Sequence, residues 1–250
     1  MKHLIELEDI WLYFETNPVL TGLSLTIYED EIISIFGPSG AGKTVLVKVI
    51  LGFLKPNSGK IYYKGKNITT LSESELAYIR KDFGMVFQNS ALFDWLTIYE
   101  NIAIALEEQK LLSKIEIRKK VEEVLEAVEL KDVENLYPNE LSGGMQKRAA
   151  IARTLALSPK IIIYDEPTTG LDPILSEAII NLIKETKEKF KTTCIIITHD
   201  LRNAIKVLDR CAFLYSGRIM KVCKGEEFLR SNEYIIKKFL RGVGIYERAV

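Results

Sequence analysis

The chain has 250 residues, of which 47% are hydrophobic and 27% charged, and its 34 basic residues balance its 34 acidic residues. These proportions are typical of a globular protein and exclude disordered, collagen-like and coiled-coil chains. A net charge of zero disfavours general nucleic-acid binding, which needs a surplus of basic residues to neutralise phosphates. The length allows one large domain or two small ones.

We expect this sequence to contain no membrane anchor of its own. Its longest apolar run, residues 45–54, is interrupted by Lys48 and is shorter than the roughly 18 residues that span a bilayer. The first residues include Glu6 and Glu8, where a signal peptide would be apolar. Three isolated cysteines cannot all pair within one chain, which favours a reducing cytoplasm. We therefore expect a cytoplasmic protein whose partners would provide any membrane attachment.

The predicted secondary structure alternates between strands and helices. Short apolar runs bounded by turn residues predict strands at residues 10–12, 20–28, 32–36, 60–63, 83–87, 161–164 and 194–197. Apolar residues at helical spacing, or a capping box, predict helices at residues 43–54, 144–157, 173–190 and 201–208 and helix starts at Ser72, Thr97 and Ser113. Apolar strands between helices predict an α/β fold with a parallel sheet and an antiparallel edge near the N-terminus.

A phosphate-binding loop is predicted at residues 37–44, Gly-Pro-Ser-Gly-Ala-Gly-Lys-Thr, which match G-x-x-x-x-G-K-[ST]. The glycines let successive backbone N–H groups face one point, and the helix that follows adds positive potential there. We expect Lys43 to reach the β- and γ-phosphates and the Thr44 hydroxyl to bind Mg²⁺. The expected nucleotide contacts are Gly37, Pro38, Ser39, Gly40, Ala41, Gly42, Lys43, Thr44 and Val45.

Two carboxylates follow the predicted strand at residues 161–164. Neighbouring side chains at a strand end point in opposite directions, so Asp165 and Glu166 can serve different partners. We expect Asp165 to face the metal ion, and Glu166 to act as the general base or to position the attacking water. An acidic turn without function is the alternative for this pair taken alone.

A second anion site is predicted within the stretch 141–148, Leu-Ser-Gly-Gly-Met-Gln-Lys-Arg, at its serine and two glycines. Ser142, Gly143 and Gly144 stand at the start of a helix with almost no acidic residues, where N–H groups and the helix dipole attract negative charge. A chain with one P-loop has no obvious need for two phosphate sites. With these residues in place, nearly the whole sequence resembles the ATPase subunits of ABC transporters.

The resemblance implies a dimer and a role for each matching residue. In that family the Leu-Ser-Gly-Gly signature of one subunit caps the ATP held by the P-loop of the other, in a head-to-tail dimer. The remaining implied roles are stacking on adenine for Phe14, contact with Mg²⁺ and water for Gln88, the D-loop for Asp172 and contact with the γ-phosphate for His199.

Two of these residues also have an ordinary interpretation. A lone Phe14 is as easily a core residue, and a lone His199 is as easily a buried, hydrogen-bonded one. The signature departs from the family pattern at Met145, where many members carry Gln, although Gln146 stands beside it.

A finer resemblance concerns lipid transport. Residues 89–101, the signature with Met145 and the segment 225–242 are similar to the ATPases associated with Mla and MCE proteins. This similarity implies ATP and Mg²⁺ as cofactors and a bacterial complex of two ATPase subunits, a permease dimer and an MCE-domain protein. Such a complex moves phospholipids or related hydrophobic molecules between membranes, with the ATPase on the cytoplasmic face of the inner membrane.

Two other functions stay open. One is the ATPase of another ABC importer or exporter, for amino acids, metals or peptides. The other is an ABC protein that acts on nucleic acid, which usually has two cassettes or long inserted arms. The balanced charge and the absence of both features disfavour nucleic acid as a partner.

The chain is expected to form a single cassette over residues 1–250, with the P-loop NTPase fold of ABC ATPases. Its core would comprise residues 1–91 and 158–230, its helical subdomain about 92–157 and its C-terminal helical tail 231–250. The apolar residues of 92–96 form either a permease docking surface or a core-facing loop. The apolar stripe in residues 235–243 packs either on the chain's own core or on a neighbouring subunit.

Overall fold

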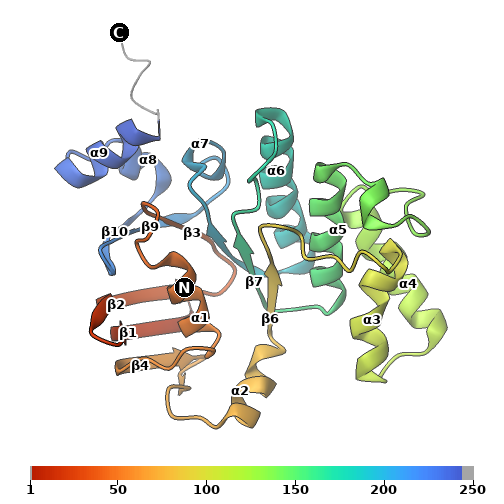
Figure 1. Cartoon of the computed structure of the whole chain (residues 1–250), viewed down its shortest axis with the longest axis horizontal. Coiled ribbons are helices and arrows are strands. Elements are labelled where there is room, and N and C mark those ends of the chain that lie inside the picture. Colours follow the sequence, from red (N-terminus) through yellow and green to blue (C-terminus); the bar gives the residue numbers. More distant parts are fainter. Residues whose placement is uncertain (1, 244–250) are drawn as a thin grey trace. The chain divides into compact units, whose positions relative to one another are not determined.

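Figure 1 shows the computed structural model of the chain, which describes residues 2–243. Contacts within the chain divide it into two compact units. Unit 1 contains the described residues up to Lys81 and those from Thr193 onward, and unit 2 contains residues 82–192. The division into core, helical subdomain and tail stays a prediction. Among the described residues, no helix combines the length and the apolar character that crossing a membrane would require.

Unit 1 opens with the predicted antiparallel sheet, in the order β2-β1-β4-β5. Its strands are β1 (His3–Phe14), β2 (Asn17–Tyr28), β4 (Ser58–Tyr63) and β5 (Lys66–Asn67). Strand β1 is longer than the predicted residues 10–12 because it pairs with both β2 and β4. Its register shifts between Leu7 and Ile10, where Asp9 has a φ of 48°, so its apolar residues do not alternate regularly along the sequence.

A second group of strands in unit 1 surrounds β3 (Ile32–Phe36), which is fully buried. Strand β3 runs parallel to β8 (Thr193–Ile197) and to β9 (Arg210–Tyr215), and β10 (Arg218–Cys223) is antiparallel to β9. The sequence predicted β3 and β8 but not β9 and β10. The missed signal is Ser216-Gly217, whose φ values of 48° and 77° form the tight turn between these strands.

The helices of unit 1 are mostly where the sequence predicts them. They are α1 (Lys43–Ile50), α2 (Glu73–Arg80), α7 (Leu201–Ala204), α8 (Gly225–Leu229) and α9 (Tyr234–Gly242). The prediction of a helix over 201–208 is too long. The chain leaves α7 in turns because Asp209 is tied to β3: Ile32 N donates to its carboxylate at 2.8 Å, and Asp209 N donates to Ile32 O at 2.9 Å.

Helix α9 packs on the chain's own core. Ile236 and Leu240 are buried in one cluster with residues of β3, β9 and α8, and Ile235 and Phe239 pack against that cluster. The rings of Phe239 and Phe213 lie 5.1 Å apart. The structure therefore supports packing within the chain for the apolar stripe.

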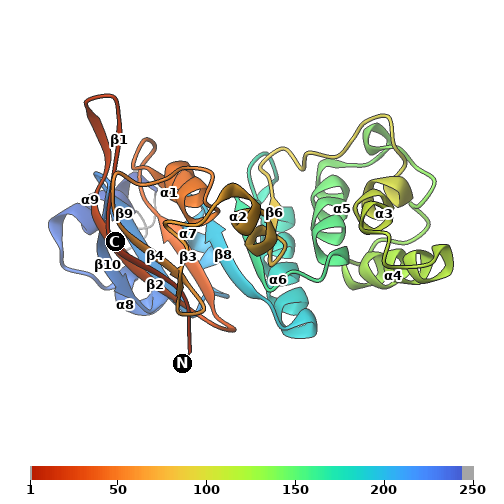
Figure 2. The same ribbon diagram turned by 90° about the horizontal axis from the view of Figure 1, so that it is seen from below.

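Unit 2 combines a parallel strand pair with helices. Strand β6 (Phe83–Val86) pairs with β7 (Ile161–Asp165), and the remaining elements are α3 (Ile98–Gln109), α4 (Lys114–Ala127), the 3₁₀ helix η1 (Pro138–Glu140), α5 (Gly143–Ala156) and α6 (Pro173–Phe190). Helices α3, α4 and α5 pack on one another (Figure 2). All three predicted capping boxes are formed, at Ser72, Thr97 and Ser113.

Candidate nucleotide site

The P-loop of unit 1 connects the buried strand β3 to α1. Gly40 and Gly42 have φ values of 77° and 102°, which few other residues adopt without strain. The Lys43 Nζ atom donates to Gly37 O at 2.8 Å and to Pro38 O at 3.1 Å, so its amine lies against the loop's own carbonyl groups. The Lys43 amine therefore lies within reach of a ligand bound in the loop.

The open side of this loop fits a phosphate. No side chain caps α1, whose N-cap is Gly42, and its first turn has no acidic residue. Ser39, Gly40 and Thr44 are exposed, and nothing lies within 4 Å of where a Cβ of Gly40 would be. A helix start of this kind binds anions through its N–H groups and its dipole.

Phe14 and His199, also in unit 1, are both exposed. Phe14 ends β1 with 48% of its surface accessible, and His199 follows β8. The alternative of a core phenylalanine is therefore wrong, and so is that of a buried histidine. Both side chains are accessible to a ligand, and their contacts with adenine and γ-phosphate stay predictions.

Unit 2 carries the predicted carboxylates and Gln88, which lies in the segment after β6, residues 87–91, called the Q-loop below. Asp165 is the last residue of β7, and Glu166 follows it with a φ of 50°, an uncommon conformation for a non-glycine residue. Both are half-buried, whereas Gln88 is exposed after β6. The chain direction turns at Glu166, so adjacent carboxylates leave the strand end differently, as two separate roles require.

The signature residues lie at the start of α5, as predicted. Ser142 is the N-cap and accepts from Met145 N at 3.4 Å, and Gly143 and Gly144 form the first turn. Ser142 and Gly143 are exposed. The Gln146 amide donates to Pro138 O at 2.9 Å and Leu141 O at 3.2 Å, so this side chain fixes the approach to the helix.

Asp172 has a structural role that the sequence analysis did not assign. Its carboxylate accepts from Ile174 N and Leu175 N, each at 2.9 Å, and so caps α6. A carboxylate at a helix start is also favoured by the helix dipole. The signal was present in the sequence as Asp before Pro173 at the start of a helix.

The donor set suits Mg²⁺ bound together with a phosphate ligand. The expected ligands Thr44, Gln88 and Asp165 offer oxygen atoms, which Mg²⁺ prefers. Within residues 2–243, no group of three or more His, Cys, Asp or Glu residues is arranged to hold a metal ion. Mg²⁺ in proteins usually keeps several waters and binds through one or two carboxylates together with substrate phosphates, and the oxygen donors named here are of that kind.

An apolar groove of about 580 Å³ lies on unit 2 beside the Q-loop. Phe83, Phe87, Phe93 and Leu157 are among its lining residues. Phe93 is 38% exposed, Trp95 is 72% exposed, and their rings lie 5.2 Å apart. The alternative of a core-facing loop is therefore wrong for these two aromatic residues.

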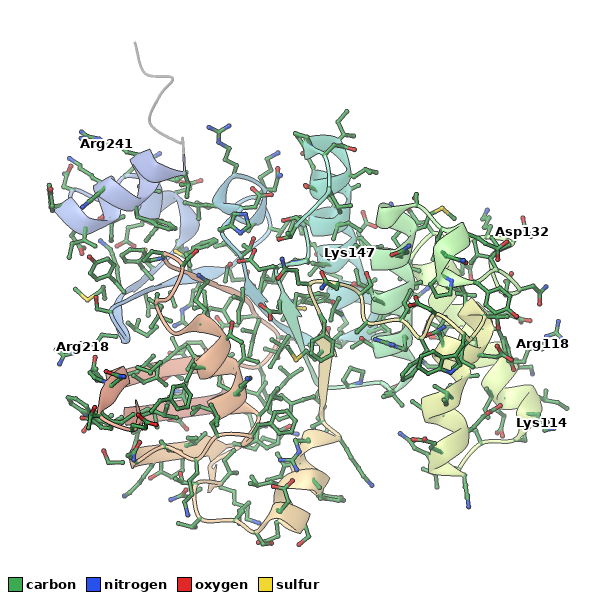
Figure 3. The ribbon with its side chains drawn as sticks, viewed as in Figure 1. Lys114, Arg118, Asp132, Lys147, Arg218 and Arg241 are labelled. Atoms are coloured by element: carbon green, nitrogen blue, oxygen red, sulfur yellow. The ribbon has the colours of Figure 1, made fainter. Side chains whose placement is uncertain are left out.

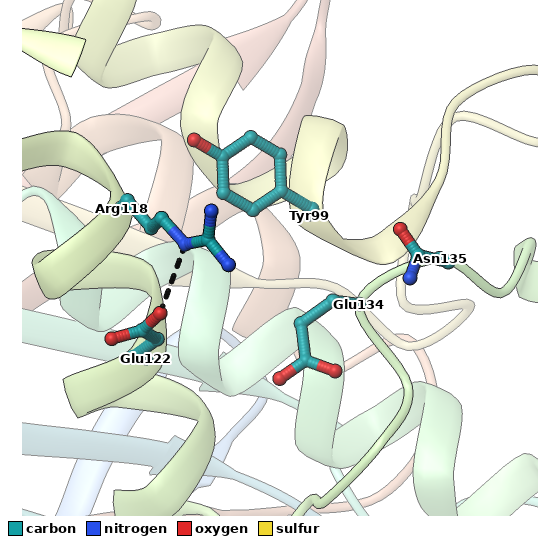
Figure 4. Close-up of a pocket in the computed structure, with 5 residues that line it drawn as sticks. All are labelled: Tyr99, Arg118, Glu122, Glu134 and Asn135. Carbon is teal, nitrogen blue, oxygen red and sulfur yellow. Dashed lines mark hydrogen bonds and ion pairs between the residues drawn. The ribbon is translucent and has the colours of Figure 1, made fainter. Parts of the chain in front are cut away.

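A second hollow on unit 2 is polar and contains none of the predicted site residues. It has a volume of about 560 Å³ and is lined by Tyr99, Arg118, Glu122, Glu134 and Asn135, with Arg118 Nε donating to Glu122 at 3.1 Å (Figure 4). One guanidinium and two carboxylates line it, and the guanidinium is already bonded to Glu122, so this hollow has no surplus of positive charge that would bind a phosphate.

Sequence reasoning passed over Lys147 on α5, labelled in Figure 3. This residue is only 5% exposed, and its amine donates to the backbone carbonyl of Gln88. The burial of Lys147 could be predicted from helical spacing, because the buried residues Ala150, Ile151 and Thr154 lie three, four and seven positions later, on the same face of the helix.

The fold and the loop define a P-loop ATPase with mixed parallel and antiparallel strands and helices. Residues 20–169 match the ABC transporter family. The chain belongs to this family and is an ATP-binding, ATP-hydrolysing subunit of the kind that drives ABC transport.

Among curated proteins, the chain is similar to the intermembrane phospholipid transport system ATP-binding protein MlaF of Haemophilus influenzae. The two are 37% identical over 241 residues, which cover 96% of this chain and 91% of that protein. The predicted likeness to the Mla ATPases is thus confirmed.

Solved structures show the same fold. CbiO1 from Clostridium perfringens, part of the ABC transporter complex cbiONQ, has a TM-score of 0.87 and 30% identity, covering 96% of each chain. The ATP-binding cassette MJ0796, in a dimeric post-hydrolysis state with ADP and Pi, has a TM-score of 0.79 and 35% identity, covering 88% of this chain and 98% of that one. The MJ0796 cassette therefore binds the products of ATP hydrolysis as a dimer.

Proposed function

We propose that this chain is the motor subunit of a bacterial ABC transporter that moves phospholipids or related hydrophobic molecules between membranes. The observation that carries the proposal is the 37% identity to the H. influenzae phospholipid transport ATPase over nearly the full length of both proteins. In this proposal the chain forms a homodimer and works with a permease dimer and an MCE-domain protein. It is held at the cytoplasmic face of the inner membrane by those partners.

ATP binding begins at the P-loop. The N–H groups of residues 37–44 and the start of α1 hold the phosphates, and Lys43 exchanges its loop carbonyl acceptors for phosphate oxygens. Phe14 stacks on the adenine ring. Thr44, Asp165 and Gln88 would hold Mg²⁺, which when bound would neutralise charge that develops on the phosphates.

Hydrolysis requires alignment more than covalent chemistry. Glu166 accepts a hydrogen bond from the attacking water, and His199 donates to the γ-phosphate, so that attack is in line with the leaving group. Ser142, Gly143 and Gly144 of one subunit close over the phosphate bound by the other, and Asp172 lies in the D-loop that accompanies this closure. The exposed position of the signature at a helix start suits such capping.

The apolar groove beside the Q-loop supports coupling to a permease. Its aromatic residues are exposed on unit 2, and an amphipathic helix is the kind of partner that an apolar groove accepts. Closure of the dimer on ATP would move this groove and so transmit the change to the membrane subunit.

Two variants test the ATPase assignment. Glu166→Gln is expected to bind ATP, to accumulate as a closed dimer and to hydrolyse about 100-fold more slowly or worse. Lys43→Ala is expected to weaken ATP binding itself. Titration with a fluorescent ATP analogue, size-exclusion chromatography and phosphate release measure the three properties. Near-normal hydrolysis by Glu166→Gln, or unchanged affinity in Lys43→Ala, would contradict the assigned roles.

The cargo class is tested through the partners. Purification of the tagged chain from detergent-solubilised membranes is expected to recover a permease together with an MCE-domain protein. Recovery of a solute-binding protein instead would favour another ABC importer. Recovery of no membrane protein would favour an ABC protein that acts in solution.

A further inference from the structure

Lys147 is a basic side chain buried in unit 2, on α5. Its ammonium group lies on α5 with 5% of the residue exposed, and burial lowers the pKa of this amine, a shift that the nearby Glu166 carboxylate opposes. A buried amine is costly unless its donors are used. The amine donates to Gln88 O, across 59 positions of sequence.

The same helix holds the neighbouring carbonyl groups of the Q-loop. Arg153 donates to Ala91 O at 2.6 Å and to Ser90 O at 3.1 Å. Side chains of α5 therefore bind the backbone carbonyl groups of Gln88, Ser90 and Ala91.

This binding fixes a backbone that would not hold its shape alone. Ser90 and Ala91 have φ values of 60° and 50°, in the left-handed region that non-glycine residues adopt at a cost. Surrounding contacts must supply that cost, and the Arg153 guanidinium contacts both carbonyl groups. The Q-loop is thus shaped by the helix that begins with the signature.

Lys147 joins two groups that the proposed function assigns to hydrolysis. It holds the backbone of Gln88 by a hydrogen bond and attracts the charge of Glu166. Its helix starts at Ser142, Gly143 and Gly144, the residues assigned to the second phosphate contact. Arg148, the next residue on α5, faces elsewhere and donates to Val128 O at 2.8 Å and to Glu129 at 2.7 Å.

We propose that Lys147 is a positioning residue for ATP hydrolysis, which holds the backbone of Gln88 in register with the signature helix. The proposal rests on the proposed function. Because the amine acts on groups that orient metal and water, its loss affects the chemical step and leaves the P-loop contacts with ATP in place. Changes in residues that support a metal's ligands typically cost about 10- to 100-fold in activity or metal affinity.

The test compares Lys147→Met, Lys147→Arg and the control Arg148→Met in the full chain. Met has similar length and no charge, so it fills the space without a buried amine. We measure kcat and KM for ATP, the Mg²⁺ concentration for half-maximal activity and the thermal midpoint without nucleotide. Lys147→Met is expected to lower kcat about 10- to 100-fold, to raise the Mg²⁺ requirement, and to change KM and the thermal midpoint little.

Lys147→Arg restores a charged donor and is expected to recover much of the lost kcat, whereas Arg148→Met should lower the thermal midpoint and leave the Mg²⁺ requirement unchanged. Wild-type kcat and Mg²⁺ dependence in Lys147→Met would overturn the proposal without touching the ATPase assignment. The proposal would also be overturned if Lys147→Met lost kcat only in parallel with a fall in its thermal midpoint, and if Lys147→Arg restored the midpoint but not kcat. Failure of the wild-type chain to hydrolyse ATP would instead refute the proposed function.

Discussion

The first glycine of the P-loop tests how closely that loop is fitted to the sheet. A Cβ added at Gly37 would lie 3.2 Å from the carbonyl carbon of Leu214, at the end of β9, and closer still to its oxygen. Ordinary contact begins at about 3.4 Å. Neither partner is a flexible side-chain end, so the backbone of β9 or of the loop must move when Gly37 is replaced by Ala.

The expected cost follows from this overlap. Overpacking that forces a backbone shift costs about 3 kcal/mol, and a chain of this size loses about 2–4 °C of thermal midpoint for each kcal/mol. Gly37→Ala is therefore expected to lower the midpoint by about 6–12 °C. It should also weaken ATP binding, because a shift of the loop displaces the N–H groups that face the phosphates.

Gly40→Ala is the matched control in the same loop. Nothing lies within 4 Å of its Cβ position, so its cost comes only from the φ of 77°. That conformation costs about 1 kcal/mol, or about 2–4 °C. Thermal unfolding followed by circular dichroism without nucleotide measures both variants. Equal losses in the two variants would refute the argument from the Leu214 contact.

Three further predictions concern the groove, the tail and a helix cap. Trp95→Ala is expected to abolish coupling of ATP hydrolysis to transport and to change the free energy of unfolding by less than about 0.5 kcal/mol, since the side chain is 72% exposed. Tyr78→Ala, which removes another exposed ring, is the control. Retained coupling in Trp95→Ala would exclude docking of the permease at Trp95. Leu240→Ala is expected to cost about 3 kcal/mol of unfolding free energy, because the side chain is fully buried in the core cluster; a loss near zero in urea unfolding would contradict packing of α9 on the chain's own core. Hydrogen bonds from Ser113 lower the pKa of Glu116 in the folded chain. This carboxylate therefore adds stability at pH values above its unfolded pKa of about 4.3, and the added stability disappears as the pH falls through the lower folded pKa. Glu116→Gln keeps the cap without titrating, and its urea midpoint should fall less than that of the wild type on acidification; identical pH profiles would disprove this.

Much of the nucleotide site could be predicted because its signals are local. The P-loop pattern, the carboxylates after β7 and the glycines at the start of α5 each depend on a few consecutive residues. The three capping boxes were predicted for the same reason, since a serine or threonine and a glutamate on one helical turn satisfy each other.

Other features depend on residues far apart in the sequence and were missed or left open. Strands β9 and β10 were missed although Ser216-Gly217 marks the turn between them, because β10 is largely exposed and its strand form depends on pairing with β9. The end of α7 is set by Asp209 bonding to Ile32, which no helical periodicity reports.

The balanced charge and the length of the chain excluded whole classes of protein, and the local motifs identified an ATPase. The sequence by itself thus determined the chemistry of the loop and the types of most elements, because hydrogen bonds within one turn or one strand end specify them. Tertiary structure alone decided that α9 packs in cis, that Trp95 is exposed and that Lys147 holds Gln88. The physical reason is that burial and pairing depend on which distant segments meet, and spacing along one segment carries no record of its partner.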